Sequence, residues 1–138
     1  MKCRSGWITG SIIIVVLTGC TDMGNEPEAD EITFSNHIQT ILNHNCTTNN
    51  PPCHEGVNAS DGLNLSEGES YTNLVNVASS YAGLLLVQSG NADSSVLYLK
   101  VTGDSQTGER MPPSGYSRLS DGQITEIRTW IDEGAENN

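Results

Sequence analysis

The sequence predicts a small, mostly α-helical domain with about four helices joined by long loops. Apolar side chains recur at helical spacing in two stretches, within residues 34–42 and 124–131. The second stretch follows a Ser-Asp-Gly-Gln sequence, which is the pattern of a capping box at a helix N-terminus. Residues 32–136, about 105 in number, are enough for one domain with a single core.

Residues 1–19 have the features of an export signal, because Lys2 and Arg4 precede an apolar stretch that is too short to span a bilayer. The Leu-Thr-Gly-Cys sequence ending at Cys20 resembles the lipobox of bacterial lipoproteins. We therefore expect Cys20 to be acylated and to anchor an exported protein in the cell envelope, on the periplasmic or outer surface side. In the alternative, an ordinary signal is cleaved nearby and Cys20 remains a thiol. Residues 20–31 are acidic and predict a flexible tether.

The charge of the chain limits its partners. Removing Lys2 and Arg4 with the signal leaves four basic residues against 17 acidic ones, a net charge of −13. Such a surface repels phosphate backbones, which argues against nucleic-acid binding. It favours a partner protein with a basic docking patch, although solubility alone would also account for it.

The first predicted helix has one apolar face and continues into Cys46. Thr33 is a suitable N-cap, and the spacing i, i+4, i+7, i+8 is occupied by Phe34, Ile38, Ile41 and Leu42. Gly56 and Gly62 then mark a loop.

The middle of the chain predicts two short helices. Ser66 and Glu69 have the spacing of a capping box before Tyr71, Leu74 and Val75, and Asp93 or Ser94 is a candidate cap for residues 96–101. The apolar run 84–87 is compatible with either a helix or an extended segment.

The start of the last helix is the best-defined boundary. Ser120 and Gln123 form its capping box, Leu119 and Ile124 are placed to staple it, and Gly134 is placed to end it. Its apolar stripe comprises Ile124, Ile127, Trp130 and Ile131. We expect Trp130 and Phe34 to join the last and first helices in the core.

Cys46 and Cys53 are the cysteines left for the folded domain, and in an exported protein a disulfide is the default expectation. However, His54 directly follows Cys53, and Met111 opens a Met-Pro-Pro turn. Cysteine sulfur to tether the macrocycle, an adjacent imidazole and a distant thioether sulfur are what a c-type haem requires. The usual attachment site is C-x-x-C-H, whereas six residues separate the cysteines here. Closing the longer loop costs only about 0.6 kcal/mol per doubling of its length.

The order of the motifs resembles small cytochrome c domains of the planctomycete-type group in bacterial exported proteins and lipoproteins. The resemblance covers most of residues 32–135 and rests on Cys-His-Glu-Gly at 53–56, Gly-Leu-Asn-Leu-Ser at 62–66, Tyr-Thr-Asn-Leu-Val-Asn at 71–76, Ser-Val-Leu-Tyr at 95–98, Arg-Met-Pro-Pro at 110–113 and the closing Trp-Ile-Asp-Glu-Gly-Ala. It implies a cytochrome c-like fold around one haem c, attached at Cys46 and Cys53. It also implies His54 and Met111 as axial ligands of the iron.

The function that follows is an electron carrier rather than an enzyme, because two axial ligands leave no position for a substrate. The competing interpretation is a haem-free lipoprotein with a Cys46–Cys53 disulfide, acting as a structural or binding module. A third is a haem peroxidase or ligand sensor with an open iron position. His37 or His44 in place of Met111, and a zinc site that includes His44, are weaker candidates.

Overall fold

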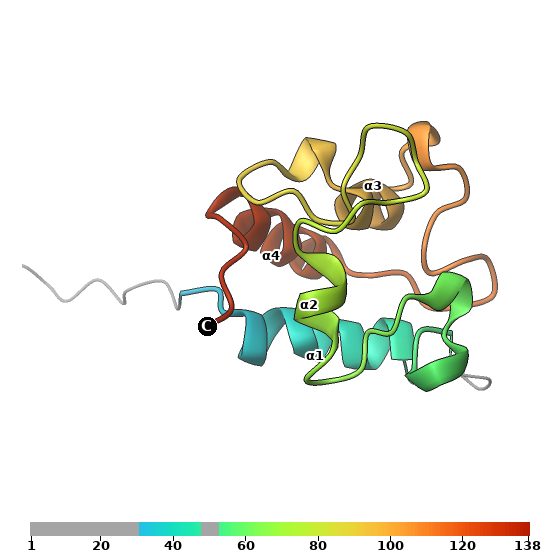
Figure 1. The fold of residues 1–138 in the computed structure, drawn as a ribbon, viewed down its shortest axis with the longest axis horizontal. Helices are drawn as coiled ribbons and strands as arrows, with labels where there is room; N and C mark the ends of the chain where they lie inside the picture. Colours follow the sequence, from blue (N-terminus) through green and yellow to red (C-terminus); the bar gives the residue numbers. More distant parts are fainter. Residues whose placement is uncertain (1–30, 48–52) are drawn as a thin grey trace, which may run out of the picture.

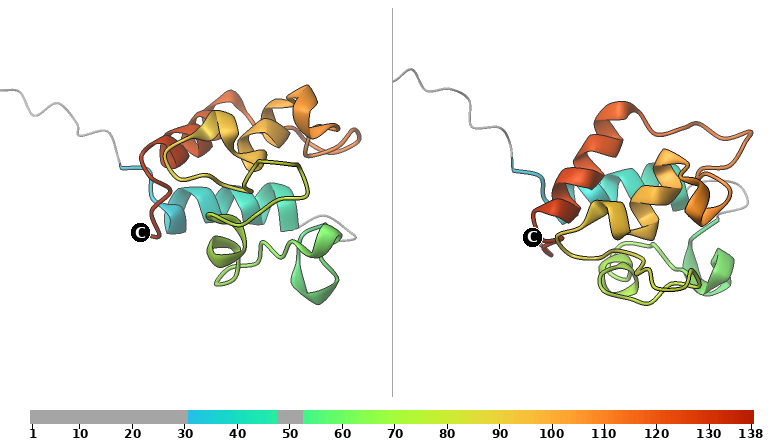
Figure 2. Two further views of the ribbon diagram at one scale, coloured as in Figure 1. Left: turned by 45° about the horizontal axis from the view of Figure 1, so that its top comes forward. Right: turned by 90° about the horizontal axis from the view of Figure 1, so that it is seen from above.

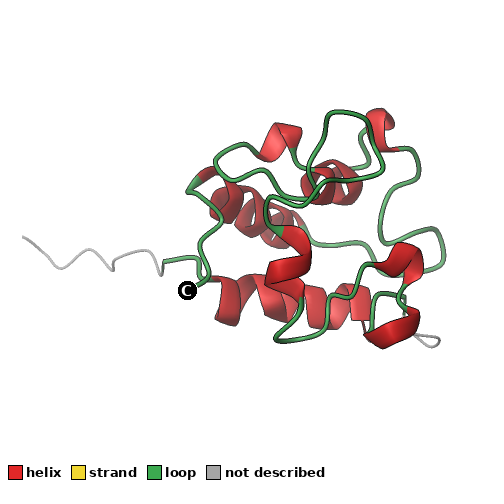
Figure 3. Ribbon diagram, viewed as in Figure 1, coloured by secondary structure: helices red, strands yellow, loops and turns green. Residues whose placement is uncertain are grey.

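The computed structural model describes residues 31–47 and 53–138. The predicted signal peptide, Cys20 and the tether up to residue 30 lie outside the described residues. The described part is mostly helical and contains no β-strand, which confirms the predicted fold class (Figures 1 and 3). Its α-helices are α1 (Gln39–Leu42), α2 (Ser70–Leu74), α3 (Val96–Thr102) and α4 (Asp121–Asp132). Short 3-10 turns occupy Gly56–Asn58, Ser60–Gly62, Ala92–Ser94 and Ser105–Thr107.

The first helix is longer than α1 alone. Wider π-helical turns at Phe34–Ile38 and Asn43–Thr47 flank α1, so the chain is helical from residue 34 to residue 47. The Thr33 hydroxyl accepts a hydrogen bond from the backbone N–H of Asn36 at 3.4 Å, as expected of an N-cap. The prediction of a capped helix that continues through Cys46 is confirmed.

Helix α4 has the predicted start and end. The Ser120 hydroxyl accepts from the Gln123 N–H at 3.2 Å, and the Gln123 side chain accepts from the Ser120 N–H at 2.9 Å, which completes the capping box. Gly134 has a φ of 118°, so the chain reverses there and the Ala135 N–H bonds the Trp130 carbonyl at 2.8 Å.

Aromatic side chains join the first helix to α4, as predicted. The Phe34 ring packs edge-on against Tyr71, with ring centroids 5.1 Å apart, and lies 5.3 Å from the centroid of Trp130. Both Phe34 and Trp130 are buried. The rest of the core is aliphatic and extends along the first helix, α2, α3 and α4; it includes Ile38, Leu42, Leu65, Leu74, Val87, Ile127 and Ile131.

The predicted capping box at Ser66 and Glu69 is wrong. Helix α2 begins four residues later, at Ser70, with no side-chain cap. The Ser66 hydroxyl instead donates to Asn64 Oδ1 at 2.7 Å, and the buried Ser70 hydroxyl donates to Gln39 on the first helix. The hydrogen bond from Ser70 to Gln39 of the first helix, rather than a local cap, therefore accompanies the start of this helix.

The predicted cap of the third helix is also wrong. Asn91 Oδ1 accepts from the Ser94 N–H at 3.1 Å and caps the short turn Ala92–Ser94, while α3 begins after Ser95. The buried Ser95 hydroxyl donates to the Asn91 carbonyl at 2.8 Å instead of capping α3. The undecided run 84–87 is extended, with isolated bridges to residues on both sides of it in sequence.

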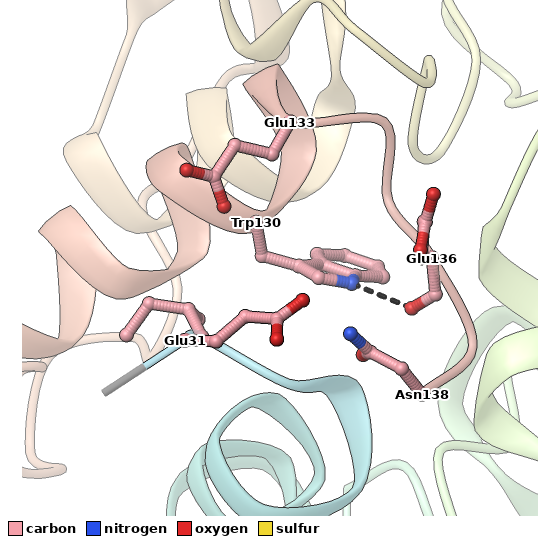
Figure 4. A pocket seen from close by; sticks show the side chains of 6 residues that line it. Glu31, Trp130, Glu133, Glu136 and Asn138 are labelled. Atoms are coloured by element: carbon pink, nitrogen blue, oxygen red, sulfur yellow. Dashed lines mark hydrogen bonds between the residues drawn. The ribbon is translucent and has the colours of Figure 1, made fainter. Parts of the chain in front are cut away.

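The two ends of the described fold meet. Asn138 accepts hydrogen bonds from the Phe34 N–H through Oδ1 at 2.8 Å and from the Ser35 N–H through its backbone carbonyl at 3.0 Å. A cavity of about 260 Å³ lies beside this junction, with Trp130 at its base and Glu31, Glu133 and Glu136 around it (Figure 4). The Trp130 indole N–H donates to the Glu136 carbonyl at 2.9 Å and thereby fixes the C-terminal segment.

Candidate functional site

The structure brings Cys46 and His54 together although seven residues separate them. The backbone N–H of His54 donates to the Cys46 carbonyl at 3.1 Å. This bond closes the segment that contains the loop 48–52, which lies outside the described residues. The end of the first helix is therefore hydrogen-bonded to the Cys53-His54 pair through the backbone of Cys46.

The imidazole of His54 has a fixed orientation. Its Nδ1 lies 3.2 Å from the Leu63 carbonyl, and because a carbonyl can only accept, Nδ1 carries the proton in this contact. In the neutral ring, Nε2 then presents a lone pair. Histidines that bind metals usually have this arrangement, in which a backbone acceptor orients the ring and raises the basicity of the ligating nitrogen.

The segment 53–66 is folded upon itself and holds His54 from two sides. The Leu65 N–H donates to the His54 carbonyl at 2.8 Å, and the Ser60 N–H donates to the Cys53 carbonyl at 2.7 Å. Asn64 Oδ1 accepts from the backbone N–H groups of Gly56 and Ser66 at 3.1 and 3.0 Å. Individual backbone and side-chain hydrogen bonds, rather than a regular element, thus position the imidazole.

Cys46 and Cys53 are thiols in the structure, and both are half-buried. Cys46 packs against the hydrophobic core. Burial, and secondarily the nearby Cys53, raises the pKa of the Cys46 thiol to about 12. At neutral pH Cys46 is therefore almost entirely the neutral thiol, which is a weak nucleophile.

Met111 lies on a separate segment. Its backbone N–H donates to the Lys100 carbonyl at 2.9 Å, near the end of α3, and the Lys100 ammonium donates to the Glu109 carbonyl at 3.1 Å. The Met111–Pro112 peptide bond is cis, and the Met111 side chain is half-buried. Lys100 therefore fixes the backbone immediately before the Met-Pro-Pro turn.

The two parts of the predicted site lie at the same end of the molecule. In all three views the segment 53–62 and the loop 103–118 occupy the end opposite the C-terminus (Figures 1 and 2). The structure groups Cys46, Cys53 and His54 closely, and Met111 comes from the loop on the other side.

The other histidines of the first helix are less suited to this site. His37 Nδ1 is bonded to the Thr33 N–H at 3.1 Å, at the start of the helix and about 14 Å along its axis from Cys46. His44 is exposed. Within residues 31–47 and 53–138, no three or more His, Cys, Asp or Glu side chains form a group that could hold a metal ion.

Sequence reasoning missed Arg110. Its Nε is buried and has no hydrogen-bond partner, and the side chain lies over Gly103, where an added Cβ would meet it at 3.2 Å. Arg110 also lines a cavity of about 400 Å³ together with Pro112, Pro113 and Arg118. The available signal was the rarity of cations in this acidic chain and the position of one of them directly before Met111.

None of the described helices is both long and apolar enough to cross a membrane. Comparisons with family models, with curated proteins and with solved structures found no match to the chain.

Proposed function

We propose that this protein is an electron carrier of the cell envelope that binds one c-type haem. Cys46 and Cys53 would provide the thioether bonds, and His54 and Met111 the axial ligands. The observation that carries the proposal is the orientation of His54, whose Nδ1 is directed at the Leu63 carbonyl beside two half-buried cysteines. When bound, the haem iron would supply the one-electron chemistry by alternating between ferric and ferrous states.

His54 would hold the iron through Nε2. The bond from Nδ1 to Leu63 prevents the ring from rotating and keeps the proton away from the ligating nitrogen. Because His54 is also held through its backbone by Cys46 and Leu65, the imidazole is placed by three separate hydrogen bonds.

The cysteines would each add S–H across one vinyl double bond of the porphyrin, with sulfur bonding to one carbon and hydrogen to the other. This addition needs no oxidant or reductant. Cys46 is suited to a thioether because burial disfavours its charged thiolate form. The wide spacing requires only that the loop between the cysteines bulges, and the bond from His54 to Cys46 supports a closed loop.

Met111 would close the other axial position from the loop that Lys100 holds. A thioether ligand favours the reduced state and raises the reduction potential. The apolar surfaces of the first helix and α4 would exclude water and act in the same direction. With both axial positions filled by side chains, the protein would transfer electrons without binding a substrate.

The acidic surface and the lipobox-like sequence support the remaining parts of the proposal. A net charge of −13 on the mature chain would favour a redox partner with a basic docking patch and would repel nucleic acid. Acylation at Cys20 would retain the exported protein at a membrane of the envelope.

Haem analysis of protein matured in its native host tests the proposal directly. We expect haem that remains bound on a denaturing gel and a His/Met absorption spectrum. A Met111→Ala variant should open the iron to added ligands and lower the potential, whereas Met23→Ala, in the tether, should change neither. An unchanged spectrum in Met111→Ala would remove Met111 from the site, and iron-free native protein would refute the proposal. Ligand binding to the wild-type reduced iron without displacement of methionine would favour the sensor interpretation.

The second candidate is a haem-free lipoprotein in which Cys46 and Cys53 form a disulfide. The nearness of Cys53 to Cys46, which contributes to the raised pKa of the Cys46 thiol, favours this candidate. Intact mass distinguishes the two, because the disulfide form lacks two hydrogens and carries no added porphyrin. Reduction with dithiothreitol should restore both hydrogens in that case and have no effect on thioether bonds.

A further inference from the structure

The Lys100 side chain joins segments that lie apart in the sequence. Its ammonium donates to the Glu109 carbonyl at 3.1 Å and lies 5.2 Å from the centroid of the Tyr81 ring. The backbone carbonyl of Lys100 also accepts from the Met111 N–H at 2.9 Å. The turn that carries Tyr81, the end of α3 and the loop before the Met-Pro-Pro turn therefore meet at Lys100, which is the one lysine of residues 31–138.

The two hydrogen bonds between Lys100 and the loop run in opposite directions. The side chain donates to the carbonyl two residues before Met111, and the backbone accepts from Met111 itself. Lys100 lies in the last turn of α3, where backbone carbonyls have no partner within the helix, so the Met111 N–H satisfies one of them. The loop is therefore attached to the end of α3 immediately before the Met-Pro-Pro turn.

Tyr81 lies on a turn that is closed by its own hydrogen bonds. The Ser79 hydroxyl accepts from the Tyr81 N–H at 3.1 Å and donates to the Leu84 carbonyl at 2.8 Å. The chain after this turn is attached to the start of α3, because the Val96 N–H donates to the Leu85 carbonyl at 3.0 Å. The aromatic ring is therefore held beside α3 and offers its face to the ammonium.

We infer that Tyr81 is a positioning residue for Met111 and that it acts through Lys100. The ring holds the ammonium and the ammonium holds the Glu109 carbonyl, so the two side chains form a clamp on the loop before Met111. A cation–π contact at an exposed site changes an equilibrium constant by a factor of about 2 to 5, so the clamp should adjust the placement of Met111 without deciding the fold. The clamp itself does not depend on haem, whereas its effect on the iron rests on the proposed function.

Amide exchange at Met111 in the haem-free full mature chain tests the clamp. Tyr81→Leu removes the ring and Lys100→Met removes the ammonium, and each should accelerate exchange of the Met111 N–H by about 2- to 5-fold. Both variants keep the backbone carbonyl that accepts this N–H, so the change reports the side chains. Tyr81→Phe keeps a ring and Lys100→Arg keeps a cation, so both should exchange as the wild type does.

The chain offers a matched control, because another cation lies over an aromatic ring of α3. The Arg128 guanidinium is 5.1 Å from the centroid of the Tyr98 ring. Arg128→Met removes this cation–π contact and leaves both members of the clamp in place. Exchange of the Met111 N–H should therefore keep the wild-type rate in this variant.

Haem-loaded protein tests the consequence for the ligand, with imidazole as a competing ligand of the oxidised iron. Tyr81→Leu and Lys100→Met should bind imidazole about 2- to 5-fold more tightly than the wild type, because Met111 is held less firmly in the ligating position. Tyr81→Phe, Lys100→Arg and Arg128→Met should match the wild type. The absorption spectrum measures the displacement of methionine.

The inference is overturned if Tyr81→Leu and Lys100→Met leave the Met111 exchange rate unchanged, or if Arg128→Met accelerates it equally. Faster exchange with unchanged imidazole affinity would overturn the positioning role and leave the proposed function standing. If native protein proves to contain no haem, the proposed function fails, and the exchange rates of the haem-free chain alone decide whether Tyr81 and Lys100 hold Met111.

Discussion

The two ends of this domain are stabilised in different ways. At one end, the first helix and α4 pack through Phe34, Trp130 and aliphatic side chains, and local capping signals define both helices. At the other end, residues 53–66 and 103–118 form turns held by individual backbone and side-chain hydrogen bonds. The helical end needs no ligand to explain its packing, whereas the loop end carries Cys53, His54 and Met111 of the candidate site, and Cys46 lies beside it in the last turn of the first helix.

This difference indicates that one end of the domain determines its stability and that the other end carries the candidate site. Burial of large apolar groups contributes most to folding, so the helical end should determine global unfolding. The loop end has few buried apolar groups, and Val57 is fully exposed there. Such regions open locally at a lower free energy than the packed core.

The largest effect should come from Trp130→Ala at the helical end. It removes a side chain that is 2% exposed and packs on Phe34, so we expect the free energy of unfolding to fall by about 3–5 kcal/mol. Urea denaturation of haem-free protein measures this change. Val57→Ala at the loop end is the control and should change stability by less than about 0.5 kcal/mol. Equal effects would contradict the distinction between the two ends.

Asn64→Ala should act mainly on the loop end. It removes the acceptor of the Ser66 N–H and the nearer of the two acceptors of the Gly56 N–H, at a cost of about 1–3 kcal/mol. Amide exchange should accelerate at residues 54–66 and remain unchanged in α4. Asn58→Ala, at an exposed position in the same segment, is the control. Faster exchange throughout the domain would show that the two ends unfold as one unit.

Ser120→Ala should destabilise α4 by about 1 kcal/mol, because it removes one of the two bonds of the capping box. Thermal unfolding measures the effect, with the nearby exposed Ser117→Ala as control. A larger loss in Ser117→Ala than in Ser120→Ala would show that the cap is not what stabilises this helix.

The smallest effect is expected for the Cys46 thiol, whose ionisation changes the folding stability only at alkaline pH. The unfolded thiol, with an ordinary pKa of 9.0, loses its proton before the folded one, whose pKa is about 12. The unfolded state then binds fewer protons, so stability is complete below pH 9 and falls as the pH rises towards 12.

Haem-free protein should show this decline, and Cys46→Ala should remove it. In haem-loaded protein the sulfur would be a thioether that cannot titrate, so persistence of the Cys46-dependent decline would show that Cys46 is not attached. Denaturant titrations at several pH values measure both cases.

Much of the helical end could be predicted from the sequence, because its signals are local. The Thr33 cap, the spacing of apolar residues after it and the box at Ser120 and Gln123 all act within one or two helical turns. The pairing of Phe34 with Trp130 followed from the two apolar faces and was confirmed.

The middle and loop segments were less predictable, since other hydrogen bonds, both local and distant in sequence, replace the capping bonds that their patterns suggest. Ser66 has the spacing of a cap, but Asn64 binds its hydroxyl, and Ser70 is held by Gln39 from the first helix. The grouping of Cys46 with His54 followed from the motif, whereas the acceptor of the imidazole, Leu63, and the buried Nε of Arg110 depend on backbone positions that no sequence pattern specifies.

The bonds from Asn138 to the start of the first helix have a consequence for orientation. These bonds hold the start of the first helix beside the C-terminal residue, at the end of the domain opposite the candidate site (Figure 1). A chain acylated at Cys20 would therefore be tethered to its bilayer from that end. Residues 20–30 span at most about 40 Å when fully extended. Under the proposed function, the haem would therefore lie at the end of the domain remote from the point where the tether joins it, where a partner protein could reach it.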